Sequence, residues 1–409
     1  MNPRPLEGLR IVEFAVWIAG PGGGAILADL GAEVIKLEEL IGDGDPYRRI
    51  GRGMGVPIKG ETGTDMNPWF DASNYNKRFV SVNTKTPEGM EIAYKLIGTA
   101  DAFVTSMRQQ MLLKRSLDYD TLHAKFPKLP YAHFLDWGEK GPLKDKPGFD
   151  ATTYFAQGGV LGNSAPEWGE YVGNFPVGFA DNWSGITTAA MTMAGILESK
   201  LHGVGDYCNS SLYNEAFWTQ RLSLMQVQFG VPFPVDTKKP SFPTINTYRT
   251  KDGKWMYLCI SDYDRYYNDL MTAIDRSDLI DHPVYSKIAE LAKSGKKQEI
   301  ADVLIKGIGS LTVKEVHERF DPKELTIEDC VSYDELLKSE QAWENDFLHT
   351  IEYPTGDTSI AMTQPINMRN APHGYERAKA LGADNNLYLK ELGYSQEAVE
   401  DLRKREIIA

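Results

Sequence analysis

Residues 9–38 read LRIVEFAVWIAGPGGGAILADLGAEVIKLE, and this segment is the most informative about the class of fold. Leu9–Ala15 and Glu33–Glu38 are short apolar runs of the kind that form buried strands. Between them, the glycines at 20–24 predict a turn that leads into a short helix at 25–30. Two strands joined by one short helix predict a parallel β-α-β unit.

The same alternation continues along the chain. Further strands are predicted at Phe79–Val82, Asp101–Ser106 and Tyr131–Trp137, with a helix at Tyr119–Lys125. Thr86-Pro87 predicts the start of another helix, because threonine caps helices and proline fits their first position. Strands that alternate with helices indicate an α/β fold, and we expect a Rossmann-like large domain.

The pattern changes in the second half. Four prolines at 232, 234, 240 and 243 mark a linker, and Asp252-Gly253 between two alternating runs predicts a β-hairpin. Capping boxes at Thr312…Glu315 and Ser332…Glu335 predict two helix starts. The predicted domains are listed here in chain order: residues 1–225, the first part of the large domain; 226–325, a smaller α+β domain; 326–409, a segment that completes the large domain.

Charge and composition exclude several classes of protein. The 409 residues carry 44 Lys+Arg against 57 Asp+Glu, a formal net charge of −13, which disfavours broad nucleic-acid binding. Three widely spaced cysteines form no CxxC pair and suit a reducing compartment. The N-terminal residues lack a signal-peptide run, and the apolar stretch Ile186–Leu197 is shorter than the roughly 20 residues that cross a bilayer. We therefore expect a cytoplasmic protein without membrane contact.

The glycine run at 20–24 is the first candidate site. It follows a strand, and Glu38 ends the next strand, as in dinucleotide-binding fingerprints. The spacing fails, because the third glycine should fall at Leu27. A tight strand–helix connection is the better interpretation, and a nicotinamide-dependent oxidoreductase remains the alternative from another class.

Asp181 is the second candidate. It stands in FADNWSG (179–185), just before the apolar stretch that begins at Ile186. It can be an ordinary N-cap of that helix. It can also be a nucleophile, since a helix N-terminus holds a carboxylate ionised. Position alone leaves both open.

A third candidate is the loop WGEKGP (137–142), which leaves a strand and leads to PGFD (147–150). Open α/β sheets bind ligands at the carboxyl ends of their strands, although an ordinary solvated loop fits equally well. The seven histidines form no HxH or HxxxH pair, so no metal is expected. A GxSxG hydrolase elbow is also missing, and His373 is interpreted as a loop residue.

Taken together, six segments resemble the class III CoA-transferases, the family of formyl-CoA transferase and the carnitine CoA-transferases. They are LEGLRIVEFA…AGP (6–21), GAEVIKLE (31–38), NKRFVSVNTKTPEG (76–89), GPLKDKPGFD (141–150), the segment around Asp181, and HGVGDYCNSSLYNEAFW (202–218). Within the family, GEKGPLKDKPGFD and SEQAWENDFLHTIEYPTG (339–356) look most like the phenyllactate and 2-hydroxyisocaproate CoA-transferases.

This resemblance implies that Asp181 is the nucleophile, with aspartyl anhydride and aspartyl-CoA thioester intermediates. The positions that match the family's CoA contacts are Ile18, Ala19, Glu39, Val82, Asn83, Thr84, Lys85, Ser106, Met107, Arg108, Lys114 and the strand end 134–137 with Trp137. Glu139 and Trp137 are expected to shape the acyl or acceptor pocket. CoA is then a substrate, and no cofactor or metal is implied.

The chain departs from the family pattern at several points. Formyl-CoA transferase has Gln at position 18 and Arg at position 39, where this chain has Ile18 and Glu39. The apolar Ile18 argues against oxalate, and Glu39 puts that adenine-side contact in doubt. Lys239–Pro243 replaces the glycine-rich lid. The related racemases need a histidine where Phe149 stands, and phenylalanine transfers no proton.

The resemblance further implies an interlocked homodimer. The apolar and aromatic residues Ile18, Trp137, Phe155 and Trp183 favour an aromatic or branched acid. Carnitine and bile acids remain alternative substrates. An inactive CoA-binding protein is a further alternative from another class.

Overall fold

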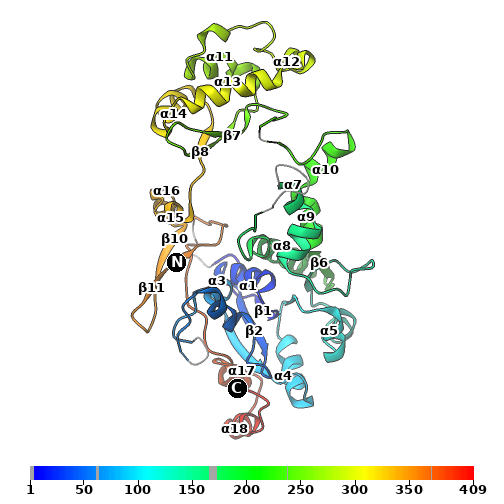
Figure 1. The fold of residues 1–409 in the computed structure, drawn as a ribbon. Coiled ribbons are helices and arrows are strands. Elements are labelled where there is room, and N and C mark those ends of the chain that lie inside the picture. Colours follow the sequence, from blue (N-terminus) through cyan, green and yellow to red (C-terminus); the bar gives the residue numbers. More distant parts are fainter. Residues whose placement is uncertain (1–3, 61–63, 165–172, 237, 370) are drawn as a thin grey trace. The chain divides into compact units, whose positions relative to one another are not determined.

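A computed structural model describes residues 4–60, 64–164, 173–236, 238–369 and 371–409. The chain divides into two compact units (Figure 1). The first unit contains residues 1–160, 174–221 and 340–409, and the second contains residues 161–173 and 222–339. Each unit is described by itself.

The first unit is built on a six-stranded parallel sheet with the order β3-β2-β1-β4-β5-β6. Its strands are β1 (Arg10–Phe14), β2 (Glu33–Glu39), β3 (Arg78–Val82), β4 (Ala102–Thr105), β5 (Tyr131–Leu135) and β6 (Tyr207–Ser211). This strand order is that of Rossmann folds, and it reverses direction between β1 and β4. The predicted α/β, Rossmann-like architecture is confirmed.

Helices cover both faces of this sheet. Successive side chains of each strand point to opposite faces, so both faces have apolar residues to bury. Ile11 of β1 packs with residues of the helices α1 and α8 on one face. Val12, the next residue, packs with α4, α5, α6, α17 and α18 on the other. The helices of this unit are α1 (Ala19–Asp29), α2 (Tyr47–Ile50), α3 (Pro68–Asn74), α4 (Pro87–Ile97), α5 (Gln109–Arg115), α6 (Tyr119–Lys125), α8 (Phe179–His202), α9 (Leu212–Thr219), α16 (Glu340–Glu344), α17 (Asn385–Glu391) and α18 (Gln396–Lys404).

Smaller elements complete the first unit. They are a 3-10 helix at Gly51–Met54, a π-helix at Ala151–Gln157, and the antiparallel pair β10 (Leu348–Glu352) and β11 (Thr358–Met362). The helices α7 (Val160–Ser164) and α10 (Arg221–Gln228) contain the residues at which the chain changes unit.

The second unit combines a three-stranded antiparallel sheet with a helical cluster. Its strands β7 (Ile245–Arg249), β8 (Trp255–Cys259) and β9 (Ile327–Asp329) lie in the order β7-β8-β9. Its helices are α11 (Tyr263–Ala273), α12 (Ile288–Ser294), α13 (Lys297–Gly309), α14 (Val313–Phe320) and α15 (Tyr333–Leu336), with short 3-10 turns at Ser277–Leu279 and Asp321–Lys323. One apolar core joins the sheet to α11 and α13.

Local sequence signals agree well with these elements. The hairpin at Asp252-Gly253 joins β7 to β8, and both predicted capping boxes are present, at Thr312 and Ser332. Thr86 caps α4 with Pro87 at its first position. The strand β6 was not predicted, because GDYCNSS carries no long apolar run.

The glycine run at 20–24 forms no turn, and that prediction is wrong. The helix α1 begins at Ala19 and takes in all four glycines. They are needed for close packing: a Cβ atom on Gly23 would lie 2.6 Å from Cβ of Thr188 in α8, and one on Gly24 would lie 1.8 Å from Oε2 of Glu13. Glycine is a poor helix former, but these positions of α1 require it because any larger residue would collide with its neighbours.

Among the described residues, no helix is long and apolar enough to cross a membrane.

Candidate active site

The site lies at the carboxyl edge of the parallel sheet, where the strand order reverses. A pocket of about 340 Å³ opens there. The segment after β1 contributes Val16, Trp17 and Ala19; the segment after β4 contributes Ser106, Met107, Arg108 and Met111; β5 and the chain beyond it contribute Phe134, Asp136, Gly148 and Phe149; Leu212 and Asp181 complete the wall. Ligands of open α/β sheets bind at such reversal points.

Asp181 is carried to this pocket by the packing of α8 on α1. The two helices touch backbone to backbone, since a Cβ atom on Gly185 would lie 3.2 Å from the backbone N of Gly23. Asp181 stands four residues before Gly185, on the same face of α8 and one turn closer to its start. The glycine contact therefore fixes the position of the carboxylate over the sheet edge.

The start of α8 differs from the sequence-based prediction. The helix begins at Phe179 rather than near Ile186, and its N-cap is Gly178 in the left-handed conformation (φ 74°). Asp181 lies in the first turn and does not cap the helix. A Cβ atom on Gly178 would lie 2.7 Å from Cδ1 of Ile18, so the helix start packs tightly against that residue.

Burial and neighbouring charges act together on Asp181. Burial raises the pKa of its carboxyl to about 8, and the carboxylates of Asp150, Asp136 and Glu215 add to that rise. Burial also raises the pKa of Asp136 to about 6, against the opposing effects of the Gly148 N–H and Arg108. A carboxylate with a raised pKa is more basic and a stronger nucleophile once ionised.

Two of these neighbours are tied to the helices around Asp181. Burial raises the pKa of Asp150, although the backbone N–H groups of Ala151, Ala180 and Gly178 oppose this effect. Glu215 of α9 accepts a hydrogen bond from the buried Ser184 hydroxyl at 2.6 Å. Since Ser184 lies on α8, this bond holds α9 against the turn that carries Asp181.

The segment before α1 is held in an unusual conformation. Trp17 has a positive φ of 67°, which costs a non-glycine residue about 1–2 kcal/mol. Its backbone N–H donates to Oδ1 of Asp45 at 3.0 Å, and the N–H of Val16 donates to the Ser106 hydroxyl at 3.3 Å. These contacts hold the Trp17 ring in the pocket wall, perpendicular to the ring of Phe149 and with the ring centres 5.6 Å apart.

A buried ionic cluster stabilises the segment around Trp17. Nζ of Lys36 lies 3.1 Å from Glu13 and 3.0 Å from Asp45, and Nζ of Lys77 lies 2.7 Å from Glu13. Lys36 also donates to the Ala15 carbonyl at 2.9 Å, and Lys77 donates to the Pro21 carbonyl at 2.7 Å. These buried charges satisfy one another and the backbone on both sides of Trp17.

The structure brings some of the predicted CoA residues to the pocket and leaves others on its periphery. Ala19, Ser106, Met107 and Arg108 line the pocket with Asp181. Ile18 is buried behind it, with Tyr47, Phe70 and Phe79. Val82 is the last residue of β3, and Asn83, Thr84 and Lys85 follow it at the same edge of the sheet. Lys114 is exposed on α5.

The segment after β3 contacts α5 through Arg115. Its Nε donates to the Thr84 hydroxyl at 2.7 Å, and its Nη2 lies 3.3 Å from Oε2 of Glu39. Glu39 also accepts a hydrogen bond from Thr84. This contact joins the parts of the chain that carry Lys85 and Lys114. Glu39 is thereby occupied by partners within the protein.

The two residues predicted to shape the substrate pocket do not line it. Trp137 is buried against Tyr213, with ring centres 5.5 Å apart, and its Nε1 donates to the Pro147 carbonyl at 3.4 Å. Glu139 is exposed and lines a different depression. The alternation of side chains explains this. Phe134 and Asp136 point to the side of Asp181, whereas Leu135 and Trp137, which alternate with them, point to the other side.

Phe155 and Trp183 also lie outside the pocket wall. Phe155 is buried and stacks on Phe175, with ring centres 4.3 Å apart, whereas Trp183 is 44% exposed. The sequence analysis placed Asp136 in the candidate strand end 134–137 and Asp150 in the candidate segment 147–150, because both follow β5 at the carboxyl edge of the sheet, but it assigned no role to either carboxylate. It gave no role to Glu215.

The nicotinamide interpretation of the glycine run finds no support in the geometry. The glycines lie within α1, and Glu38 is buried in a bidentate pair with Arg48, at 2.9 and 2.7 Å. This carboxylate is therefore unavailable to a ribose. His373 bonds to Asp29 and, at 2.8 Å, to Asn367, which joins the C-terminal segment to the end of α1.

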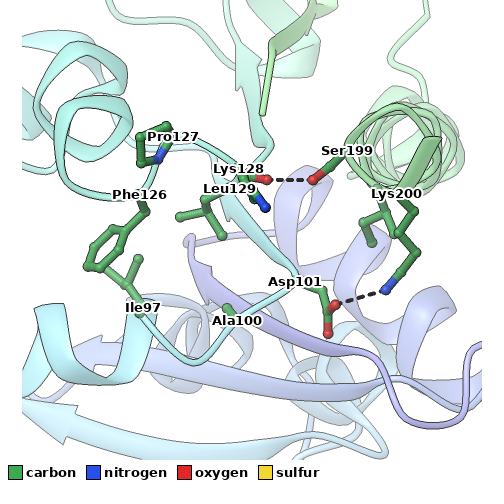
Figure 2. A pocket seen from close by; sticks show the side chains of 11 residues that line it. Ile97, Ala100, Asp101, Phe126, Pro127, Lys128, Leu129, Ser199 and Lys200 are labelled. Carbon is green, nitrogen blue, oxygen red and sulfur yellow. Dashed lines mark hydrogen bonds and ion pairs between the residues drawn. The ribbon is translucent and has the colours of Figure 1, made fainter. Parts of the chain in front are cut away.

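A second and larger cavity lies at the amino edge of the same sheet (Figure 2). It has a volume of about 520 Å³ and lies between the ends of α4 and α6 and the last turns of α8. Three of its polar side chains have partners: Lys200 pairs with Asp101 at 3.2 Å, and the Ser199 hydroxyl donates to the Lys128 carbonyl at 2.6 Å. No group of His, Cys, Asp or Glu among the described residues could hold a metal ion at either edge.

One protein family matches nearly the whole chain. The family model of CoA-transferase family III matches residues 6–385. The chain belongs to this family. Accordingly, the protein is a class III CoA-transferase, and the predicted enzyme class is confirmed.

Relatives of known name extend over the full length. The (R)-2-hydroxy-4-methylpentanoate CoA-transferase of Clostridioides difficile is 34% identical over 98% of this chain and 99% of its own length. The cinnamoyl-CoA:phenyllactate CoA-transferase of Clostridium sporogenes is 33% identical over 98% of this chain and 97% of its own. Both agree with the subgroup predicted from the sequence.

A solved structure shares the fold. The crystal structure of Rv3272 from Mycobacterium tuberculosis superposes with a TM-score of 0.79 at 24% identity, over 95% of this chain and 100% of that one.

Proposed function

We propose that the enzyme moves CoA between an acyl-CoA, of the 2-enoyl or 2-hydroxyacyl type, and a free 2-hydroxy acid such as phenyllactate or 2-hydroxyisocaproate. The observation that supports this most strongly is Asp181, a desolvated carboxyl group in an apolar pocket at the reversal point of the sheet. The pocket walls include Val16, Trp17, Phe134 and Phe149, which suit a branched or aromatic side chain. The names of the two full-length relatives point to the same acids.

In the proposed reaction, a carboxylate oxygen of Asp181 attacks the thioester carbonyl carbon. The C–S bond breaks, leaving a mixed anhydride and CoA thiolate. The thiolate then attacks Cγ of Asp181, the anhydride C–O bond breaks, and the first acid leaves as its carboxylate. Repeating these two steps in reverse order with the incoming acid yields the new acyl-CoA and restores Asp181. One thioester replaces another, so no metal or redox cofactor is needed.

Exposed cations support the binding of the CoA phosphates. Lys85, Arg108 and Lys114 all follow strands at the carboxyl edge and are exposed, so they can offer ammonium and guanidinium groups to phosphate oxygens. The contact between Arg115 and Thr84 brings the segment of Lys85 beside α5. The local positive charge offsets the net charge of −13 for an anionic substrate.

We further propose a homodimer, in the interlocked form that the family resemblance implies. Large apolar side chains are uncovered in each unit, including Leu201 at 66% exposure and Phe229 at 84%. The helix α10 has no buried residue at all. Large apolar side chains left exposed in this way are typical of surfaces that a partner chain covers. Location in the cytoplasm stays a prediction.

The test is intact-mass analysis of the protein after incubation with cinnamoyl-CoA or 4-methylpent-2-enoyl-CoA, with and without hydroxylamine. We expect a CoA or acyl adduct that maps to Asp181 and is absent in Asp181→Ala. Asp145→Ala, at an exposed carboxylate of the loop after β5, is the matched control and should keep the adduct. A folded wild-type protein that forms no adduct with any CoA ester would return the chain to a CoA-binding role.

Carnitine and bile acids stay as alternative acceptors. A panel of acids with one common donor separates them from the 2-hydroxy acids. A preference for oxalate or carnitine over phenyllactate and 2-hydroxyisocaproate would contradict the proposed substrate class.

A further inference from the structure

The pocket around Asp181 contains a second carboxyl group that the reaction itself does not use. Asp136 follows β5 directly and lines the same wall as Asp181. The proposed chemistry needs one carboxylate as nucleophile. A second negative group beside it repels an incoming carboxylate, so its presence calls for a separate purpose.

The polar side chains of this pocket are few, and most have assigned contacts. Ser106 is engaged with the backbone of Val16, through its N–H and its carbonyl oxygen, at 3.3 and 3.2 Å. Arg108 is exposed and offers only donors. Asp181 is the nucleophile. Among the lining side chains, Asp136 is therefore the acceptor left to meet a hydroxyl donor of the substrate.

The Asp136 carboxyl group is half used within the protein. Its Oδ2 accepts the backbone N–H of Gly148 at 2.9 Å, which fixes the orientation of the group. No described residue donates a hydrogen bond to Oδ1. An ionised carboxylate is only an acceptor, so this oxygen suits an O–H donor of a ligand.

The chain makes room for this side chain at Gly148. A Cβ atom there would lie 2.7 Å from Cβ of Asp136 and 3.0 Å from its Cγ. Any other residue would push the carboxyl group out of its position. The pair of Asp136 and Gly148 thus forms a preorganised acceptor in an otherwise largely apolar wall.

We propose that Asp136 accepts the 2-hydroxyl of the acid substrate and so selects 2-hydroxy acids over their deoxy analogues. The 2-hydroxyl stands on the carbon next to the reacting carboxyl carbon, so its acceptor must lie in the pocket of Asp181, as Asp136 does. A site built to bond a hydroxyl discriminates against the analogue that lacks it, because the buried acceptor is then left unpaired. This inference rests on the proposed function and names its specificity-determining residue.

The experiment compares two acids that differ only in the hydroxyl, 2-hydroxy-4-methylpentanoate and 4-methylpentanoate, with 4-methylpent-2-enoyl-CoA as the donor. The readout is the ratio of kcat/KM for the two acids. We expect wild type to favour the hydroxy acid, and Asp136→Ala to lower that ratio about 10- to 100-fold, as for one hydrogen bond to a charged group. Asp136→Asn keeps an acceptor oxygen and should recover part of the preference.

Two further variants separate this role from simple damage. Gly148→Ala keeps the Asp136 carboxylate but moves it out of its position, so this variant should lower the ratio as well. Asp145→Ala, an exposed carboxylate in the same loop, should leave the ratio unchanged.

The outcomes are distinguishable from failure of the proposed function. An equal loss for both acids in Asp136→Ala overturns the inference, while CoA transfer by wild type still stands. The same holds if wild type does not discriminate between the acids. If wild type transfers CoA to neither acid, the proposed function fails and this inference fails with it.

Discussion

The two edges of the parallel sheet differ in how their acidic side chains are paired, and this difference does not follow the size of their cavities. The amino edge holds the larger cavity, of about 520 Å³ against about 340 Å³ at the carboxyl edge. At the amino edge, the Asp101 carboxylate accepts the Arg10 N–H at 2.9 Å and pairs with Lys200. At the carboxyl edge, Asp181 lies near three other acids, forms no ion pair with any described residue, and has a raised pKa.

Helix direction is part of the reason. The helices α1 and α8 begin at the carboxyl edge, whereas α4 and α6 end at the amino edge. Helix starts offer unpaired N–H groups and a partial positive charge, which favour anionic ligands and developing negative charge. Acids without an ion-pair partner beside helix starts indicate a reactive site. Paired ions beside helix ends indicate a structural role.

The largest expected effect is that of Asp181→Asn. We expect CoA transfer to fall at least ~10³-fold, since the amide cannot act as the nucleophile. The same change should stabilise the fold at pH 8. Because the folded pKa of about 8 lies above the unfolded value of 3.8, wild type loses stability as the pH rises between them.

Thermal unfolding of both proteins at pH 4 and pH 8 measures this. The variant should gain on the order of 1–2 kcal/mol at pH 8, less than the full shift implies because the pocket is open to solvent, and almost nothing at pH 4. A variant that is less stable at both pH values would mean that Asp181 supports the fold and that the site is not strained by its charge.

The pH dependence of kcat/KM tests whether the acids at the carboxyl edge raise the pKa of Asp181. In the proposed reaction Asp181 attacks only when ionised, so kcat/KM should rise about tenfold per pH unit below about 8 and level off above it. Glu215→Gln removes one of the charges that raise the pKa of Asp181, so the break should move to lower pH. Asp136 and Asp150 would remain to hold it above the ordinary value.

Asp101→Asn at the amino edge is the control for that profile, and its break should coincide with that of wild type. A break that moves equally in both variants would mean that general net charge, rather than the local group of acids, sets the pKa of Asp181.

The smallest effect is expected for Lys200→Ala. Its ion pair with Asp101 is largely exposed, so its loss should cost less than about 1 kcal/mol of stability and change kcat/KM less than about twofold. Denaturant unfolding and a steady-state assay measure both quantities. A large loss of activity would mean that the amino-edge cavity has a function, contrary to the expectation that only the carboxyl edge is reactive.

Five of the six strands of the parallel sheet, the hairpin, several helix caps and the family could be predicted from the sequence. These features depend on neighbours along the chain: apolar runs form β1 and β2, Asp252-Gly253 forms a turn, and Thr312 with Glu315 forms a capping box. The aspartate at 181 could be selected because its segment matches a family motif. Its cap-like position was misread, because the helix start at Phe179 depends on Gly178 packing against Ile18.

Which side chains share the pocket depends on how the elements pack in the folded chain. The glycines at 20–24 read as a turn, yet they form a helix because α8 approaches them too closely for any side chain. Trp137 was the conspicuous residue after β5, but the alternation of side chains along the strand turns Asp136 toward Asp181 and Trp137 toward Tyr213. The raised pKa of Asp181 arises first from burial and then from acids that lie 31 to 45 positions away in sequence, and both conditions exist only in the folded chain.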